Sequence, residues 1–167
     1  MYEARKICNF LLENFDAVEF DLTNLRINKL LFFIHAESLR LRPEGLVRNH
    51  FEAWQFGPVV RPVFDAFKIY KESPITAPAL YLDYASGRQV PVPYGNISSS
   101  DVEIIVREFK KYSRFSTGQL VSLSHEAGGP WDVVYRAQLA DATLSPRIPN
   151  KLIRSHFAGE EKSTVRH

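Results

Sequence analysis

The stretch LRINKLLFFIHAESL, residues 25–39, decides the fold because its apolar side chains leave no wide polar face on a helix. With about 3.6 residues per turn, they surround the helix axis on nearly all sides, which is typical of a helix at the centre of a small domain. Asp21 or Thr23 is suited to cap this helix, which should end near Leu41, ahead of Pro43. We predict that the rest of the chain packs around it.

Helical patterns flank this segment on both sides. Residues 4–15 place apolar side chains at the i, i+3, i+4 spacing of one helix face. Further helices are predicted from Arg61-Pro62, after Ser100, from Ser116 to about His125, from Pro130 and from about Pro149. The fold class is therefore mainly α, a compact single-domain helical bundle of about six to seven helices with a small β-hairpin insertion.

Two stretches interrupt the helices. Residues 47–56 are less periodic, and Gly57-Pro58 is expected to break the chain. Between Ser73 and Gly95, four prolines exclude a helix through most of the segment. There, Tyr81, Leu82 and Tyr84, the Ser86-Gly87 turn, and Val90 and Val92 follow the pattern of a hairpin. The prolines should hold that hairpin to a sheet edge.

Two helix starts carry capping-box sequences. In Ser100-Asp101-Val102-Glu103, the serine should accept from the amide three residues on, while Glu103 reaches back. Ser116-Thr117-Gly118-Gln119 repeats the pattern. Both boxes predict where a helix begins.

Composition favours one folded domain. Of the 167 residues, 45% are apolar and 24% charged, which is enough apolar material to bury a core. We expect this domain to span residues 1–157 and the polar, aperiodic residues 158–167 to form a flexible tail. Aromatic residues make up 13%, an excess that favours a partner-binding role for some of them.

Charge and cysteine content exclude several classes of protein. Lys and Arg are scattered among nearly equal numbers of acids, so no basic stripe indicates nucleic-acid binding. Cys8 is the single cysteine, which rules out an internal disulfide and favours a reducing cytoplasm. No signal peptide or bilayer-spanning apolar stretch is recognised. We expect a cytoplasmic protein with no membrane partner.

His125-Glu126 is the best enzymatic candidate. Adjacent helix residues point about 100° apart, so the two side chains are not placed to touch, and His125 is more typical of a helix C-terminus. The phosphate-binding glycine loop, the G-x-S-x-G elbow and H-E-x-x-H are all missing, and the histidines lack a metal-ligand spacing. We therefore expect no enzyme, no catalytic or metal-binding residue and no cofactor.

Three further polar residues have non-catalytic interpretations. Lys29 must either extend outward or meet an acid, and periodicity favours a polar face shared with Arg26. His35 is interpreted as a half-buried, hydrogen-bonded histidine. Cys8 lies in an apolar stripe, where it serves as a small hydrophobic residue.

Three motifs resemble one known family, in the same order along the chain. They are the Lys-Leu-Leu-aromatic helix of residues 25–33, FEAWQFGPVV at residues 51–60, and a Ser-His pair followed by Pro130-Trp131. This combination resembles the Panacea-domain family of SocA-like antitoxins and phage-associated proteins. Asn28 stands where that family often has Gln, and Phe32 and Phe33 where it often has Tyr. The motif residues expected to serve the fold or a partner contact are Lys29, Trp54, Phe56, Gly57, Pro58, His125 and Trp131.

The resemblance implies an antitoxin that neutralises a cognate protein toxin, encoded by a neighbouring gene, through direct binding. Members of the family neutralise unrelated toxins, so the resemblance implies that recognition lies on variable surfaces outside the shared core. Both tryptophans are interpreted first as core residues. In residues 79–94 the candidate toxin-binding residues are Tyr81, Tyr84 and Tyr94.

Three other functions stay open. An adaptor would deliver the toxin to an ATP-dependent protease. A DNA-binding autorepressor would need a helix-turn-helix or a basic face, and the sequence shows neither. A small hydrolase would use His125 and Glu126.

Overall fold

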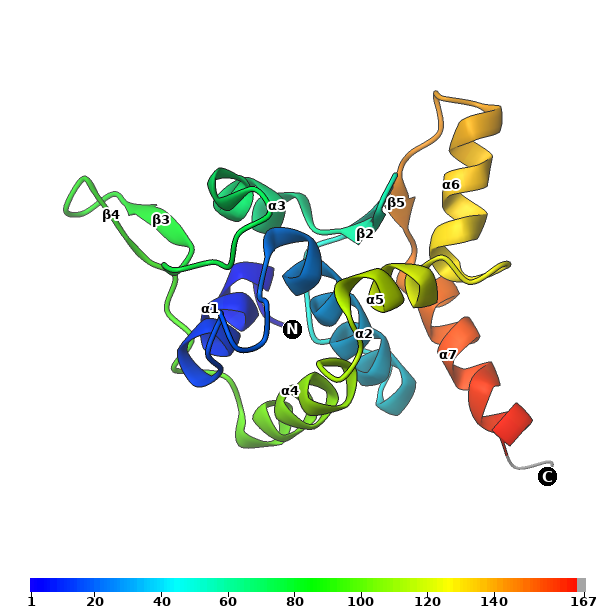
Figure 1. Cartoon of the computed structure of the whole chain (residues 1–167), viewed down its shortest axis with the longest axis horizontal. Helices are drawn as coiled ribbons and strands as arrows, with labels where there is room; N and C mark the ends of the chain where they lie inside the picture. The colour runs from blue at the N-terminus through cyan, green and yellow to red at the C-terminus, as the bar shows by residue number, and fades with distance from the viewer. Residues whose placement is uncertain (165–167) are drawn as a thin grey trace.

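The computed structural model describes the backbone of residues 1–164 and the side chains of residues 1–159. Within this part, seven α-helices and five short strands form a mainly helical domain, which confirms the predicted fold class (Figure 1). The helices are α1 (Ala4–Asn14), α2 (Asn24–Leu41), α3 (Arg61–Phe67), α4 (Ser99–Tyr112), α5 (Thr117–Ser124), α6 (Pro130–Ala140) and α7 (Asn150–Thr164). The strands are β1 (Phe51–Trp54), β2 (Gly57–Val59), β3 (Leu80–Asp83), β4 (Arg88–Pro91) and β5 (Arg147–Ile148), and a 3₁₀ turn, η1 (Lys68–Tyr70), follows α3.

Helix α2 lies at the centre of the molecule, as its sequence predicts. Thr23 caps it by accepting a hydrogen bond from the Arg26 amide at 3.3 Å. Helices α1, α3, α4, α5 and α7 and strand β2 all contact it, and its apolar residues between Ile27 and Leu39 are buried. Each such side chain contributes roughly 1.5–3 kcal/mol of hydrophobic stabilisation when fully buried. The other elements are thus held by a shared apolar axis.

A three-stranded antiparallel sheet, in the order β2-β1-β5, lies beside α2. Trp54 in β1 pairs with Gly57 in β2 across a tight turn. Phe51 in β1 pairs with Ile148 in β5, which directly precedes α7. The sheet therefore joins the middle of the chain to its C-terminal helix.

Residues 47–56, which are less periodic in sequence, contain a strand that was not predicted, and the break expected at Gly57-Pro58 is the point where a hairpin turn leads directly into a second strand. Gln55 and Phe56 form the turn of the β1–β2 hairpin. Gly57 follows with a φ of +101°, a conformation that glycine adopts without steric cost. Pro58 is tolerated because β2 is an edge strand, where a missing N–H disrupts no ladder on the open side.

The predicted hairpin insertion is confirmed as β3 and β4, which among the described strands pair only with each other. In Figure 1 it projects from the helical body. Its stem is fixed by Asn9 of α1, whose buried amide donates to the carbonyls of Ala79 (2.9 Å) and Val92 (3.0 Å). Asn9 also accepts from the Ala79 amide at 2.7 Å. One buried side chain thus holds both strands to the body.

The capping box predicted at Ser100 and Glu103 is wrong by two residues. Helix α4 is capped by Ser98, whose hydroxyl accepts from the Asp101 amide at 3.3 Å. The Asp101 carboxylate in turn accepts from the Ser98 hydroxyl at 2.8 Å. Residues 98–100 are all serines, so local sequence offers several equivalent caps and a tertiary contact selects one of them.

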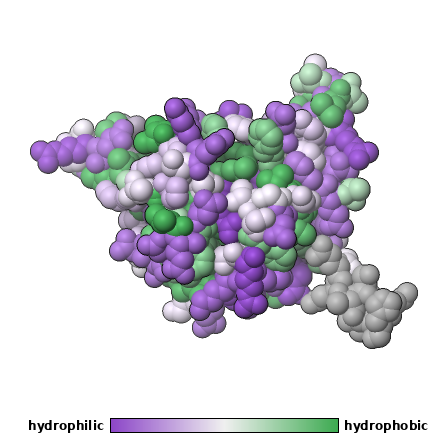
Figure 2. All heavy atoms as spheres, viewed as in Figure 1, coloured by the Kyte–Doolittle hydropathy of each residue, from purple (hydrophilic) through white to green (hydrophobic). Residues whose placement is uncertain are grey.

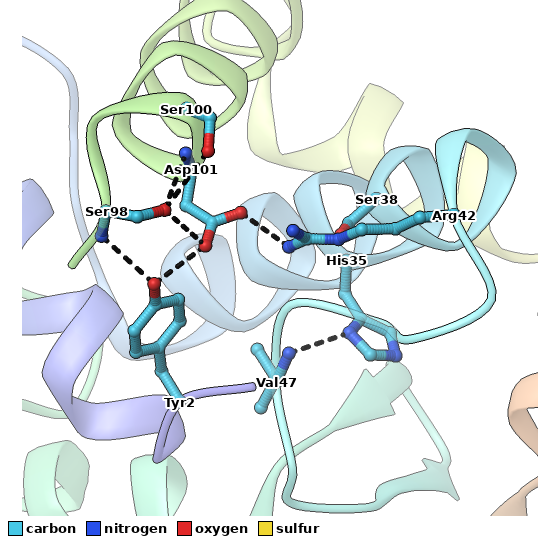
Figure 3. A network of polar contacts seen from close by, with 8 residues as sticks. All are labelled: Tyr2, His35, Ser38, Arg42, Val47, Ser98, Ser100 and Asp101. Atoms are coloured by element: carbon cyan, nitrogen blue, oxygen red, sulfur yellow. Dashed lines mark hydrogen bonds and ion pairs between the residues drawn. The ribbon is translucent and has the colours of Figure 1, made fainter.

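That contact is a polar network around Asp101 (Figure 3). The Tyr2 hydroxyl donates to Asp101 Oδ2 at 2.7 Å and accepts from the Ser98 amide at 3.0 Å. Arg42, at the C-terminal end of α2, forms an ion pair with Asp101 Oδ1. Burial alone would raise the pKa of Asp101, but hydrogen bonds from Tyr2, Ser98 and Arg42 hold it below its usual value. The network locks the start of the chain and the start of α4 onto α2.

The start of α5 and the end of α7 are the two remaining helix boundaries. The capping box of α5 is confirmed, with Ser116 Oγ accepting from the Gln119 amide at 3.2 Å and Gln119 Oε1 accepting from the Ser116 amide at 2.8 Å. Helix α7 continues to Thr164, into the segment 158–167 expected to form a tail. Residues 165–167 lie outside the described residues, so the flexible tail stays a prediction.

Replacing Asp101 by Asn should lower the free energy of unfolding by about 1–3 kcal/mol at neutral pH, because the half-buried Arg42 loses its negatively charged partner. The folded-state pKa of Asp101 is depressed, so its contribution is present above its ordinary pKa and lost as the pH falls through the folded-state value. The difference between wild type and Asp101→Asn, measured by urea denaturation, should therefore shrink below about pH 4. Glu103→Gln, an exposed change in the same helix turn, is the control; equal losses in both variants would contradict the network.

Candidate functional site

Residues from the three family-like motifs meet around Gly57. The ammonium of Lys29, on α2, donates to the carbonyl oxygen of Pro58 in β2 at 2.9 Å. A Cβ placed on Gly57 would lie 2.6 Å from Lys29 Cε and 2.7 Å from Ser124 Oγ, at the end of α5. A side chain at position 57 would force these atoms apart, so the glycine allows α2, β2 and α5 to meet. The three motifs are therefore in contact with one another in the folded chain, and the primary role of these residues is close packing.

Lys29 is fully buried, so its interpretation as part of a solvent-facing polar surface with Arg26 is wrong. No carboxylate pairs with it among the described residues, and burial lowers its pKa to about 7. Arg26 is also buried, and its guanidinium donates to the carbonyls of Ser113 and Phe115, each at 2.9 Å. The periodicity of the sequence predicts a polar face for these two residues, but neighbouring elements cover α2 at both positions.

Trp131 connects α6 to this cluster. Its indole N–H donates to the Trp54 carbonyl at 2.8 Å, and its ring stacks on His125 (centroids 3.6 Å apart) and on Tyr135 (4.6 Å). Trp131 is buried, whereas Trp54 is half-buried and donates its own indole N–H to Glu52 at 2.8 Å. The core role expected for the tryptophans describes Trp131 well and Trp54 in part.

His125 and Glu126 point to different neighbours. His125 Nε2 is buried without a hydrogen-bond partner among the described residues, and burial followed by the charge of Lys29 lowers the pKa of the ring. The Glu126 carboxylate lies 3.2 Å from His156 Nε2 on α7. The arrangement does not join His125 and Glu126 as an acid–base pair.

His35 and Cys8 are packing residues. His35 is fully buried rather than half-buried: its Nδ1 accepts from the Val47 amide at 3.1 Å (Figure 3), and Nε2 lies 3.2 Å from Asn150 Oδ1. Burial lowers its pKa to about 4. Burial raises the pKa of the Cys8 thiol, which keeps the thiol protonated. Within the described residues, no group of three His, Cys, Asp or Glu side chains is placed to hold a metal ion.

Among the seven motif residues expected to serve the fold or a partner contact, Phe56 alone faces mainly outward, with 60% of its surface exposed at the β1–β2 turn. Beside it lies a groove of about 660 Å³ whose apolar lining includes Leu25, Trp54, Val59 and Phe64. Concave apolar surfaces of this size accommodate ligands or anchoring side chains. No sequence pattern indicates this groove, because its walls come from separate segments of the chain.

The candidate tyrosines are divided by the structure. Tyr84, in the hairpin loop, is 89% exposed and Tyr81, in β3, is 39% exposed. Tyr94 instead packs edge-on against Phe10 at the stem, with ring centroids 5.9 Å apart. Leu80 and Leu82 are exposed as well. Figure 2 shows hydrophilic side chains at the far tip of the hairpin and hydrophobic ones nearer the body.

Among the described residues, no helix combines the length and the hydrophobicity that a membrane span requires. The family model "Antitoxin SocA-like, Panacea domain" matches residues 27–132, a range that contains every motif residue from Lys29 to Trp131. A curated relative, "Antitoxin SocA" of Caulobacter vibrioides (strain NA1000 / CB15N), is 35% identical over 162 residues, covering 96% of this chain and 85% of the relative. No solved structure gives a significant match.

Lys29→Met should remove a rise of stability with pH that the wild type shows between about pH 7 and pH 10. The pKa of Lys29 is about 7 in the folded state and near 10.5 when unfolded, so the unfolded chain binds more protons in this window. The free energy of unfolding should therefore increase with pH by up to about 1.4 kcal/mol per pH unit from this residue. Urea denaturation across the window measures it.

Two comparisons isolate the lysine. The raised thiol pKa of Cys8 acts in the opposite direction above about pH 9, and this effect cancels when wild type and Lys29→Met are subtracted. Lys110→Met changes an exposed lysine of α4 and should keep the wild-type slope. The same slope in Lys29→Met would show that Lys29 does not titrate there.

Proposed function

The chain belongs to the Panacea-domain family of SocA-like antitoxins, and on that premise we propose that it neutralises a cognate protein toxin by binding it directly. The observation that carries the proposal is the projecting β3–β4 hairpin, whose apolar side chains are exposed to water. Clustered exposed apolar side chains on a soluble surface favour a protein partner that covers them. Blocking by contact requires no catalytic group.

The hairpin is held ready for such a contact. An isolated two-stranded hairpin is marginally stable in water, but Asn9 fixes this one at Ala79 and Val92. A binding element that is ordered beforehand loses less conformational entropy on association. Tyr81 and Tyr84 then act as aromatic anchors, while Tyr94 supports the stem through Phe10.

The motif residues that pack around Gly57 contribute to this function indirectly. Lys29 and Trp131 are buried, so a partner cannot reach them without opening the fold. Their role in the proposal is to position the surface elements. Phe56 and its groove form a second, smaller surface on which the toxin can rest.

The toxin is proposed to be the product of a neighbouring gene, and the pair to act in the cytoplasm. The protonated, buried thiol of Cys8 is compatible with that reducing compartment. Expression of the neighbouring gene alone should stop growth, and co-expression with this chain should restore it. A neighbour that is harmless alone would contradict the proposal.

An adaptor for an ATP-dependent protease would share the binding step but would also shorten the life of the toxin. Toxin levels in the co-expression experiment separate the two. A stoichiometric blocker should leave the toxin half-life unchanged or longer, whereas a markedly shorter half-life would favour the adaptor.

The double variant Tyr81→Ala/Tyr84→Ala should bind the toxin at least about tenfold more weakly and fail to restore growth, because it loses two aromatic anchors. Titration calorimetry with the purified toxin measures the affinity, and circular dichroism should show an unchanged helix content. Leu139→Ala removes an exposed apolar side chain of α6 and should bind normally. Full neutralisation by the double variant would exclude these tyrosines.

A further inference from the structure

The two outer edges of the β3–β4 hairpin differ. The Val92 amide donates to the Ala79 carbonyl at 2.9 Å, which identifies these residues as a hydrogen-bonded pair. In an antiparallel ladder, hydrogen-bonded and non-hydrogen-bonded pairs alternate, so Tyr81–Val90 is bonded and the neighbouring pairs are not. The residues whose main-chain groups point away from the hairpin are therefore Leu80 and Leu82 on β3, and Gln89 and Pro91 on β4.

Proline closes much of the β4 edge. Pro91 has no N–H, so Gln89 is the only outward main-chain donor on that strand. On β3, both Leu80 and Leu82 keep their N–H groups. The Leu80 carbonyl accepts from Arg5 Nη1 at 3.0 Å, which agrees with its outward direction. The open edge is thus β3, and Leu82 presents both a donor and an acceptor there.

The side chains beside this edge suit an added strand. Leu80 and Leu82 lie on one face of the hairpin and Tyr81 on the other, and all three are exposed. A strand placed next to β3 would thus meet apolar side chains on both of its faces. Natural proteins usually blunt such edges with charge, proline or a covering segment.

The charge near the β3 edge indicates which kind of segment would bind there. On the Tyr81 side, a groove of about 510 Å³ is lined by Arg5, Lys6 and Arg48, with Glu3 as its single acidic side chain. Glu3 pairs with Arg5, and Lys6 bonds to Asn96. Arg48 is exposed, and it leaves the groove with net positive charge. An acidic residue flanking the incoming strand would be attracted to it.

We propose that the β3 edge from Leu80 to Leu82 takes up an extended, partly apolar segment of the toxin, with an acidic flank, as an additional strand. The inference rests on the proposed function, because it specifies how the toxin is held. Main-chain hydrogen bonds at Leu82 fix the segment, and the exposed leucines and Tyr81 flank it.

Amide hydrogen exchange tests the pairing directly, with the purified product of the neighbouring gene as the probe. The Leu82 amide should exchange rapidly in the free chain and at least tenfold more slowly in the complex, while the Gln89 amide should be unaffected. Absence of any binding by the wild type would overturn the proposed function itself. Binding with an unprotected Leu82 amide would overturn strand addition alone.

Matched variants separate main-chain pairing from side-chain contact. Leu82→Pro removes the outward N–H and the side chain, Leu82→Ala removes most of the side chain, and Gln89→Pro removes the outward N–H of the opposite edge. Leu82→Pro should bind at least tenfold more weakly than Leu82→Ala, and Gln89→Pro should bind as wild type does. Retained exchange protection at Val92 verifies an intact stem. Equal affinity of the two Leu82 variants would contradict the pairing.

Two further experiments test which molecule pairs with the β3 edge. Arg48→Glu should weaken binding several-fold, and the loss should diminish at high salt. No effect would contradict the acidic flank. Sedimentation of the free chain should show a monomer; a dimer that is abolished by Leu82→Pro would assign the edge to a second copy instead.

Discussion

The hydrogen bond from the Lys29 ammonium to the Pro58 carbonyl is the contact on which the packing around Gly57 depends. It joins the central helix to an edge strand that has few side chains of its own with which to pack. Through that strand, β1 is placed to pair with β5 and to accept the indole N–H of Trp131. Helices α6 and α7 are thereby tied to a sheet that is itself tied to α2.

Burying this ammonium without an acidic partner is unfavourable. The lowered pKa reduces the cost, because near neutral pH much of the lysine can be uncharged. The pKa of the neighbouring His125 ring is also lowered, so the ring adds little positive charge that would repel the ammonium. Within the described part of the chain, the Lys29 side chain has one hydrogen-bond acceptor, the Pro58 carbonyl. If Lys29 moved away, that carbonyl would be left buried and unpaired, so this hydrogen bond favours a single arrangement of α2 and the β1–β2 hairpin.

Sequence predicted those elements whose local signals agree with their surroundings. In four places the local sequence pattern agrees with the structure that the complete fold forms there. These are the apolar stripe of α1, the apolar run of α2, the Ser116–Gln119 capping box and the Ser86-Gly87 turn. The β1–β2–β5 sheet was missed because the partner of Phe51, Ile148, lies far along the chain and Pro58 argues locally against a strand. Burial of Lys29 and the choice of Ser98 as a cap were invisible for the same reason: neighbours distant in sequence decide both. The convergence of the motifs was likewise hidden, although their residues were recognised.

The hairpin shows how an open edge is compatible with a stable chain. Main-chain groups left unpaired at an edge invite uncontrolled pairing with other molecules. Here the β4 edge is interrupted by Pro91, and Arg5 already occupies the Leu80 carbonyl. Asn9 keeps the stem from peeling away from α1. On β3, a short stretch around Leu82 keeps outward main-chain groups without a partner among the described residues. This stretch is too short to support extended aggregation, but it is long enough to align one added strand. In the strand addition proposed above, the same features that limit nonspecific pairing also set the register of the partner strand.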